Sequence, residues 1–65
     1  MNLIVNAQPR EVSSATLALA LPELGFTSPA VATALNGTFV PRDARDVTHL
    51  KDGDRLEVLA PMQGG

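Results

Sequence analysis

The stretch VATALNGTFV, residues 31–40, decides the fold that this sequence predicts. Asn36 and Gly37 stand in its middle, between two short runs that carry β-branched residues. An Asn-Gly pair suits a type I′ turn, because that turn needs a positive φ at both central positions. The stretch therefore predicts a β-hairpin made of strands 31–35 and 38–40.

The turn also sets which side chains face each other across the hairpin. The expected pairs are Leu35 with Thr38 and Thr33 with Val40. Ala34 and Phe39 then point to the opposite face of the sheet, because successive side chains of a strand alternate between its faces.

Residues before this stretch predict a second hairpin. Residues 1–5 are apolar and branched, which is typical of a strand. Turn-forming residues at 6–9 then bring residues 10–12 back antiparallel, with Val12 turned inward.

Residues 15–24 are the one good helix candidate. Three leucines at i, i+4 and i+7 form its apolar stripe, namely Leu17, Leu21 and Leu24. Pro22 lacks a backbone donor, which predicts that the helix bends or breaks near Leu21. Gly25 is suited to end the helix. Three residues compete as the N-cap: Ser13, Ser14 and Thr16.

Three further segments complete the domain. Residues 42–50 are polar and predict a connecting loop with one helical turn, held to the core by Val47 or Leu50. Residues 51–54 predict a tight turn, and residues 55–60 predict a last strand.

This order of elements predicts an α+β domain in which one helix packs on one face of a mixed sheet. The first and last strands pair in parallel at the centre, because the segment between them is long enough for a crossover. This is the ubiquitin-like β-grasp arrangement, with the domain over residues 1–60 and a flexible C-terminal tail over residues 61–65. The expected core is formed by Leu3, Val5, Val12, Leu17, Leu21, Leu24, Val31, Leu35, Val40, Leu50, Leu56 and Val58.

Large apolar residues are left over from that core, on the sheet face away from the helix: Ile4, Phe39 and Leu59. Together with Ala34 they predict an apolar patch beside the tail, of the kind that marks a partner-binding face. The alternative is that the loop of residues 42–50 folds over part of this face.

The composition narrows the classes of function. The length of 65 residues suits one domain. The absence of Cys excludes disulfides and thiolate chemistry, and the single His49 makes no His cluster, so we expect no metal and no bound cofactor. The net charge of −2 and the pI near 5.0 argue against nucleic-acid binding. No apolar run reaches the ~20 residues of a membrane span, and no signal peptide is visible, so we expect a cytoplasmic protein.

The last two residues, Gly64 and Gly65, carry no side chain and therefore suit a narrow slot on another protein. Such a slot on a partner enzyme would admit Met62, Gln63 and Gly64 with the α-carboxylate of Gly65 at the tip. The alternative is an ordinary frayed terminus or a remnant of cloning.

Short segments along essentially the whole chain resemble the ThiS family, the sulfur carrier proteins of thiamin thiazole biosynthesis. They are NLIVN (2–6), PREV (9–12), LNG (35–37), VPR (40–42), KDGD (51–54) and GG (64–65). Pro22 and Phe39 depart from the family pattern, which usually has a continuous helix and a smaller aliphatic residue at these positions.

The resemblance implies that the protein is a substrate in each step and not an enzyme. A ThiF-type, E1-like enzyme is expected to use ATP to adenylate the Gly65 carboxylate. Sulfur that a cysteine desulfurase takes from cysteine then displaces AMP and leaves a thiocarboxylate, which a thiazole synthase of the ThiG type uses as its sulfur donor. We expect the free carrier to be a monomer.

The residues themselves agree with activation by another protein. A carboxylate is a poor electrophile, and neither glycine-containing turn of the domain resembles a phosphate-binding loop. Asp52 and Asp54 flank a turn glycine and are expected to form that turn, and His49 is expected to be solvated. Three rival interpretations stay open: a carrier of another pathway, such as the small-subunit type of molybdopterin synthase or a carrier for cysteine synthesis; a protein modifier; and a plain binding module.

Overall fold

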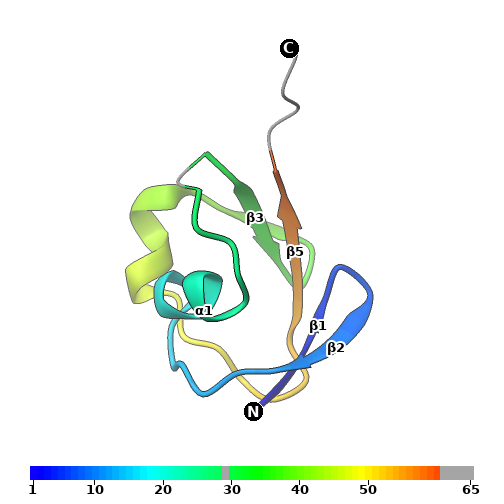
Figure 1. The fold of residues 1–65 in the computed structure, drawn as a ribbon. Coiled ribbons are helices and arrows are strands. Elements are labelled where there is room, and N and C mark those ends of the chain that lie inside the picture. Colours follow the sequence, from blue (N-terminus) through cyan, green and yellow to red (C-terminus); the bar gives the residue numbers. More distant parts are fainter. Residues whose placement is uncertain (29, 61–65) are drawn as a thin grey trace.

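The computed structural model describes residues 1–28 and 30–60, which form a mixed sheet with one α-helix on one face (Figure 1). The elements are β1 (Asn2–Val5), β2 (Gln8–Glu11), α1 (Leu17–Glu23), β3 (Ala32–Leu35), β4 (Thr38–Val40), the 3₁₀ helix η1 (Arg42–Val47) and β5 (Arg55–Leu59). The strand order is β2-β1-β5-β3-β4. β1 and β5 pair in parallel at the centre, so the predicted ubiquitin-like β-grasp fold is confirmed.

The hairpin of β3 and β4 has the predicted register. Its pairs are Leu35 with Thr38, Ala34 with Phe39 and Thr33 with Val40. Asn36 and Gly37 have φ angles of 50° and 83°, as a type I′ turn requires. β3 begins at Ala32, one residue later than predicted.

The first hairpin is tighter than predicted. Its turn consists of Asn6 and Ala7 alone, with φ angles of 49° and 69°, and β2 already begins at Gln8. The predicted bounds, with a turn over residues 6–9 and a strand over 10–12, are therefore wrong. The antiparallel return and the inward-facing Val12, which is buried, are confirmed. Alanine rarely adopts a positive φ, so this pair does not announce a two-residue turn. Pro9 is tolerated in β2 because an edge strand leaves one row of its backbone groups without a partner.

The helix is shorter than predicted and continues through its proline. α1 spans Leu17–Glu23 with Pro22 inside. Of the predicted bend or break near Leu21, the break is therefore wrong, and the bend stays a prediction. Pro22 removes a single backbone donor close to the helix end, and the N–H of Leu24 still donates to the Ala20 carbonyl at 2.9 Å. Thr16 occupies the N-cap position but makes no side-chain capping bond.

A Schellman motif ends the helix after Leu24, the C-cap residue. Gly25 has a φ of 98°, and its N–H donates to the Pro22 carbonyl at 3.0 Å. The N–H of Phe26 donates to the Leu21 carbonyl at 2.8 Å, and Phe26 is partly buried against the core. The predicted stop at Gly25 is confirmed.

The core lies between the sheet and α1, and it contains the predicted residues except Leu35, which is only partly buried. Ala20 joins the core because it shares the inner face of the helix with Leu17 and Leu21. Leu50 is buried whereas Val47 is exposed, so Leu50 is the residue that holds the segment 42–50 to the core.

η1 packs against α1 and places Arg45 in the interior with 7% exposure. The Arg45 guanidinium donates to the Thr33 hydroxyl at 3.2 Å and to the Val31 carbonyl. These bonds tie η1 to β3 and satisfy polar groups that are buried with it.

Candidate functional site

The sheet has one face covered by the core and one open face, and β5 shows the difference most clearly. Its exposed residues alternate with buried Leu56 and Val58. Arg55, Glu57 and Leu59 therefore stand on the open face, side by side along the central strand. Leu59 is 70% exposed, although it is a large apolar residue at the end of a central strand.

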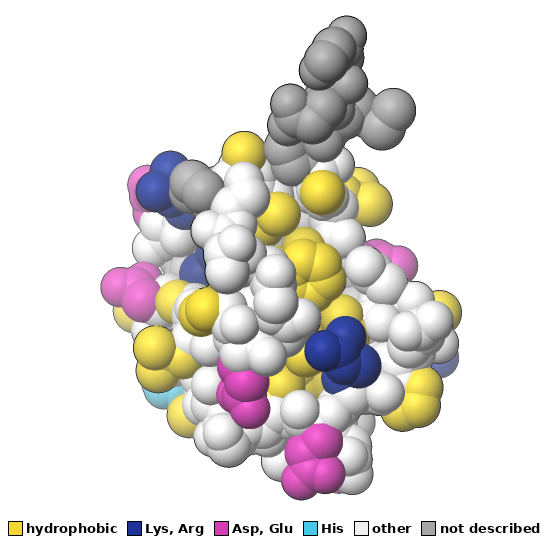
Figure 2. All heavy atoms as spheres, viewed as in Figure 1, with side chains coloured by type: hydrophobic (Ala, Val, Ile, Leu, Met, Phe, Trp, Pro, Cys, Tyr) yellow, Lys and Arg dark blue, Asp and Glu magenta, His cyan; other side chains and the backbone are white. Residues whose placement is uncertain are grey.

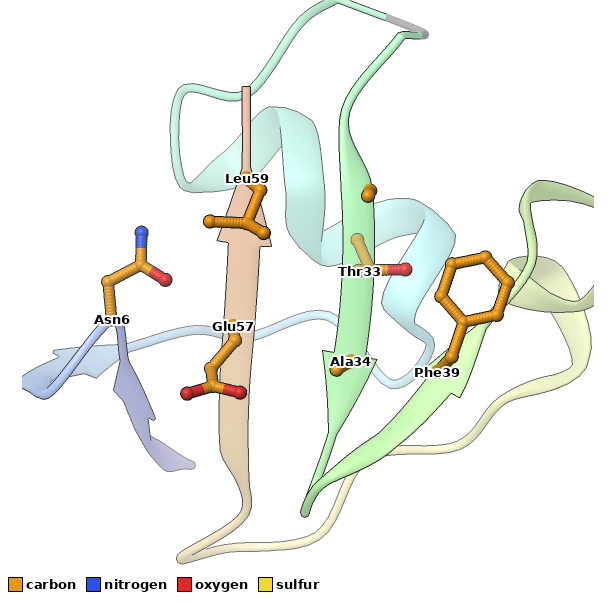
Figure 3. A pocket seen from close by; sticks show the side chains of 7 residues that line it. Asn6, Thr33, Ala34, Phe39, Glu57 and Leu59 are labelled. Carbon is orange, nitrogen blue, oxygen red and sulfur yellow. The ribbon is translucent and has the colours of Figure 1, made fainter. Parts of the chain in front are cut away.

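A groove of about 250 Å³ lies on this open face (Figure 3). Its floor contains two alanines of β3, because Ala34 lies between Phe39 and Glu57 on the neighbouring strands and Ala32 lies beside Leu59. The Phe39 ring stands at one side of the groove and Leu59 and Glu57 at the other. Small side chains between larger ones thus create the hollow, whose lining residues are Asn6, Ala32, Thr33, Ala34, Phe39, Glu57 and Leu59.

The structure brings together three of the four residues predicted for the partner-binding face. Ala34, Phe39 and Leu59 line the groove, and Phe39 is 65% exposed. Ile4 is half-buried and lines a separate hollow with Ala7 and Arg55. β5 lies between β1 and β3 in the sheet, so Glu57 on β5 stands between Ile4 and the two residues on the far strands, Ala34 and Phe39. Leu59 lies on β5 itself and lines the groove but not the hollow of Ile4.

The loop of residues 42–50 does not cover the groove. η1 packs against α1, on the opposite side of the sheet. No residue of 42–50 is among those that line the groove. The open face therefore stays accessible in the part of the chain that the structure describes.

Sequence reasoning missed Asn6, which holds the central strand at the rim of the groove. Its amide nitrogen donates to the Val58 carbonyl at 3.1 Å, and the Val58 N–H donates to its amide oxygen at 2.9 Å. The side chain thus extends the β1–β5 ladder beyond the last paired backbone residue, Val5. Asn6 adopts this position in a two-residue turn in which it and Ala7 both have a positive φ. The sequence did not indicate this turn, because alanine rarely adopts a positive φ.

Asn36 plays the matching part at the start of β5. Its amide oxygen accepts the Arg55 N–H at 2.9 Å, and its amide nitrogen donates to Asp54 Oδ1 at 3.0 Å. The turn asparagines of the two hairpins therefore fix β5 from both sides. This matters for the site, because β5 carries Glu57 and Leu59.

Asp52 and Asp54 are turn formers, as predicted. Asp52 accepts the backbone N–H of Asn2 at 2.7 Å. Asp54 is buried and accepts the N–H of Lys51 at 2.7 Å. His49 is exposed, and residues 1–28 and 30–60 hold no group of three His, Cys, Asp or Glu residues that suits a metal ion.

Glu23 has an unusual environment at the end of α1. The Ser14 hydroxyl donates to its carboxylate at 2.6 Å, and the Ser13 N–H donates at 2.8 Å. These bonds, with those from the Ser13 hydroxyl and the Ser14 N–H, lower the pKa of Glu23 to about 2. The low pKa keeps the Glu23 carboxylate ionised at neutral pH, so it does not exchange protons there. Its hydrogen bonds with Ser13 and Ser14 attach the loop after β2 to the helix.

The predicted tail residues Met62, Gln63, Gly64 and Gly65 lie outside the described residues. Their roles remain predictions. The groove nevertheless adjoins the tail in the sequence, because Leu59 is both a groove residue and the last residue of β5.

Two further observations concern the charge of the surface and the length of the helices. Figure 2 shows basic and acidic side chains interspersed on the visible face, without a stripe of Lys and Arg. Within the described ranges, no helix is long and apolar enough to cross a membrane.

Comparison with known proteins gives the same picture along the whole chain. The family model of the ThiS family matches residues 3–65. The sulfur carrier protein ThiS of Thermus thermophilus is 40% identical over 62 residues, which cover 94% of this chain and 95% of that protein. A thiazole synthase of Paramagnetospirillum magneticum is 38% identical over 66 residues, which cover all of this chain but only 20% of the synthase.

Solved structures agree in fold as well as in sequence. The crystal structure of the thiamine biosynthesis protein ThiS of Geobacter metallireducens has a TM-score of 0.83 and 39% identity, covering 100% of both chains. The solution structure of the same organism's thiamine biosynthesis protein has a TM-score of 0.81 and 39% identity, covering 100% of this chain and 88% of that chain. Because the sequence match and the shared fold both extend over nearly every residue, the chain belongs to the ThiS family.

Proposed function

We propose that this protein is a sulfur carrier of thiamin biosynthesis whose terminal carboxylate, on Gly65, is the sulfur-bearing group. The observation that carries the proposal is the family match, which extends through residue 65, together with the similarity to the Thermus thermophilus sulfur carrier over 94% of this chain. The carrier acts as a substrate, and the catalytic groups belong to the enzymes that act on it.

The chemistry follows from what a carboxylate needs before sulfur can enter. The carboxylate oxygen attacks the α-phosphorus of ATP, pyrophosphate leaves, and the product is a mixed anhydride with AMP. Sulfur at the oxidation level of sulfide then attacks the activated carbonyl carbon and displaces AMP, which leaves a thiocarboxylate. An E1-like enzyme of the ThiF type supplies the ATP site. A cysteine desulfurase takes sulfur from cysteine as a persulfide, and a thiol reductant releases it at the oxidation level of sulfide while the thiol is oxidised to a disulfide.

The acceptor of the sulfur in this proposal is a thiazole synthase. Support comes from the thiazole synthase of Paramagnetospirillum magneticum, since a segment of that longer chain matches this entire protein. A carrier domain and a synthase within one polypeptide work at high effective concentration. The same pairing between separate chains requires a docking surface, and the proposal assigns that role to the open sheet face with Ala34, Phe39 and Leu59.

In this proposal, the two terminal glycines allow the tail to enter narrow channels of the partner enzymes. Glycine lets the backbone approach another surface closely, and the proposal assigns Gly64, Gln63 and Met62 to the stretch that enters the partner enzymes. The carrier itself needs no bound cofactor, and it works in the cytoplasm as a monomer when it is free.

The test is the intact mass of the protein after incubation with ATP, a ThiF-type enzyme, a cysteine desulfurase, cysteine and a thiol reductant. We expect a mass gain equal to sulfur replacing oxygen, localised to Gly65, and no gain without ATP. The Gly64→Trp variant should fold normally and fail to be adenylated. An unchanged wild-type mass, with the same enzymes active on another carrier, would refute the proposal.

A second stage separates the pathways. The thiocarboxylate form is mixed with thiazole synthase and its substrates, and in parallel with a molybdopterin synthase large subunit. Sulfur transfer to the thiazole product alone supports the thiamin assignment, whereas transfer only in the molybdopterin reaction contradicts it. A ligated lysine adduct in place of the thiocarboxylate would identify a protein modifier.

A further inference from the structure

A carboxylate occupies the middle of the open sheet face. Glu57 is the central residue of β5, and β5 is the central strand of the sheet. Its side chain lines the apolar groove with Phe39 and Leu59, the hollow beside Ile4, and the hollow beside Asn36 and Gly37. Any protein that covers this face has to accommodate the charge of Glu57.

Glu57 is solvated in the free protein. It is exposed, and its carboxylate takes part in none of the side-chain hydrogen bonds or ion pairs found among the described residues. Leu59 and Ala34 flank it, so the surroundings are largely apolar on the side of the groove (Figure 3). A partner that fills the groove with an apolar side chain therefore also removes water from this carboxylate.

Removing water from an unpaired carboxylate is costly, whereas a positively charged partner restores the lost interactions. A guanidinium suits the position best, because its planar fork donates two parallel hydrogen bonds to one carboxylate. The groove volume of about 250 Å³ holds an apolar side chain next to that pair. The open face thus specifies both an apolar group and a cation on its partner.

We propose that the enzyme which activates the tail presents a basic residue to Glu57 and an apolar side chain to the groove between Phe39 and Leu59. This rests on the proposed function, because β5 leads directly into the segment that carries Gly65. It adds a charge requirement, so Glu57 determines which protein surfaces the carrier accepts. The net charge of −2 favours the same basic partner surface at long range.

Arg55 is the one alternative source of positive charge on the same strand face. It lies two residues before Glu57 and lines the two neighbouring hollows together with it, but it does not line the apolar groove. If Arg55 neutralised Glu57 on docking, the partner would need no basic residue. The experiment therefore includes a variant of Arg55.

The test measures the affinity of the carrier for a ThiF-type activating enzyme by isothermal titration calorimetry, with ATP absent. We expect Glu57→Gln to weaken binding on the order of 30-fold, as for loss of one partner of a buried charge pair, and Glu57→Lys to weaken it further. The control is Asp43→Lys, which makes the same change of charge on exposed η1 and should bind like the wild type.

Three outcomes decide the matter. Selective loss in the Glu57 variants, with an unchanged thermal midpoint, supports the proposal. Equal affinity of Glu57→Lys and the wild type, or an equal loss in Arg55→Ala and Glu57→Gln, overturns it. Adenylation of the wild type at excess enzyme is followed in parallel by intact mass. If the proposed function is wrong, the wild type is not adenylated. If only the charge requirement is wrong, the wild type is fully adenylated and the Glu57 variants bind the enzyme as tightly as the wild type.

Discussion

Leu56 and Leu59 are the same residue type on the same strand, three positions apart, yet the fold treats them in opposite ways. Leu56 is 0% exposed in the core beneath α1, whereas Leu59 is 70% exposed on the open face. The covered face holds the domain together through apolar burial. The open face contributes little to folding, and for that reason its residues are free to specify a partner.

Truncating both leucines is the most direct test of whether the two faces of the sheet contribute differently to stability. Leu56→Ala should lower the free energy of unfolding by about 2–5 kcal/mol, because it leaves a cavity in the core. Leu59→Ala should change it by no more than ~0.5 kcal/mol, as is usual for exposed positions. Urea denaturation followed by circular dichroism measures both.

The matched pair contains its own control, since the chemical change is identical at both positions. Equal destabilisation by the two variants would show that the open face is not open in solution. In the activating-enzyme assay the order should reverse at a temperature where Leu56→Ala remains folded, with Leu59→Ala as the weaker binder.

Asn6 combines both kinds of role. It lines the groove on the open face, and it stabilises the fold through two hydrogen bonds to Val58 of β5. Asn6→Ala should destabilise the domain by about 1–3 kcal/mol, since it removes both bonds and leaves alanine at a φ of 49°. Asn6→Gly loses the same bonds without the backbone strain, so it should cost about 1 kcal/mol less.

Thermal and urea unfolding of both Asn6 variants separate the two contributions. If Asn6→Gly were as stable as the wild type, the amide bonds to Val58 would carry no net stability. Hydrogen exchange of the Val58 N–H should become faster in both variants, whereas that of the Arg55 N–H, which Asn36 binds, should change less.

The smallest expected effect is on the pH dependence of stability. It concerns Glu23 at the end of α1, whose carboxylate accepts hydrogen bonds from Ser13 and Ser14. Its pKa falls from 4.5 to about 2 on folding, so the unfolded chain binds the proton first as the pH drops. Its contribution to stability is complete above pH 4.5 and is lost as the pH falls toward about 2. Glu23→Gln should therefore flatten the loss of stability in this range.

The measurement is urea denaturation at several pH values between neutrality and strong acid. Glu11→Gln serves as the control, because Glu11 is an exposed carboxylate on β2. Identical pH profiles for Glu23→Gln and the wild type would contradict the role given to the serine bonds. The effect is expected to be modest, since water screens an exposed group.

The two hairpins show how far local sequence predicts this fold. Asn36 and Gly37 announce their turn because both suit a positive φ, and the register of β3 and β4 follows from them. Asn6 and Ala7 also form a turn with positive φ angles, but the sequence does not predict it, because alanine seldom adopts a positive φ. Val5 of β1 pairs with Gln8 of β2, which leaves only two residues for the connection, so Ala7 adopts a conformation that its own preference disfavours.

The candidate site shows the same division. Alternation along the last strand predicted that Leu59 faces away from the core, and the hairpin register placed Ala34 beside Phe39. Sequence alone did not reveal that Ala32 and Ala34 form a groove floor, or that Glu57 stands between the groove and Ile4. Those features depend on which strands become neighbours, and residues far apart in the chain determine that.

By itself, the sequence determined the class of the fold, nearly all of its core and the family to which it belongs, because hydrophobic periodicity, turn residues and short motifs are local. The tertiary structure decided the rest: that Leu50 and not Val47 joins the core, that α1 continues through Pro22, and that the side chain of Asn6 pairs with β5. Pro22 within the helix and the positive φ of Asn6 each carry a small local cost. Local preferences are weak compared with the burial of a shared core, so the distant contacts prevail.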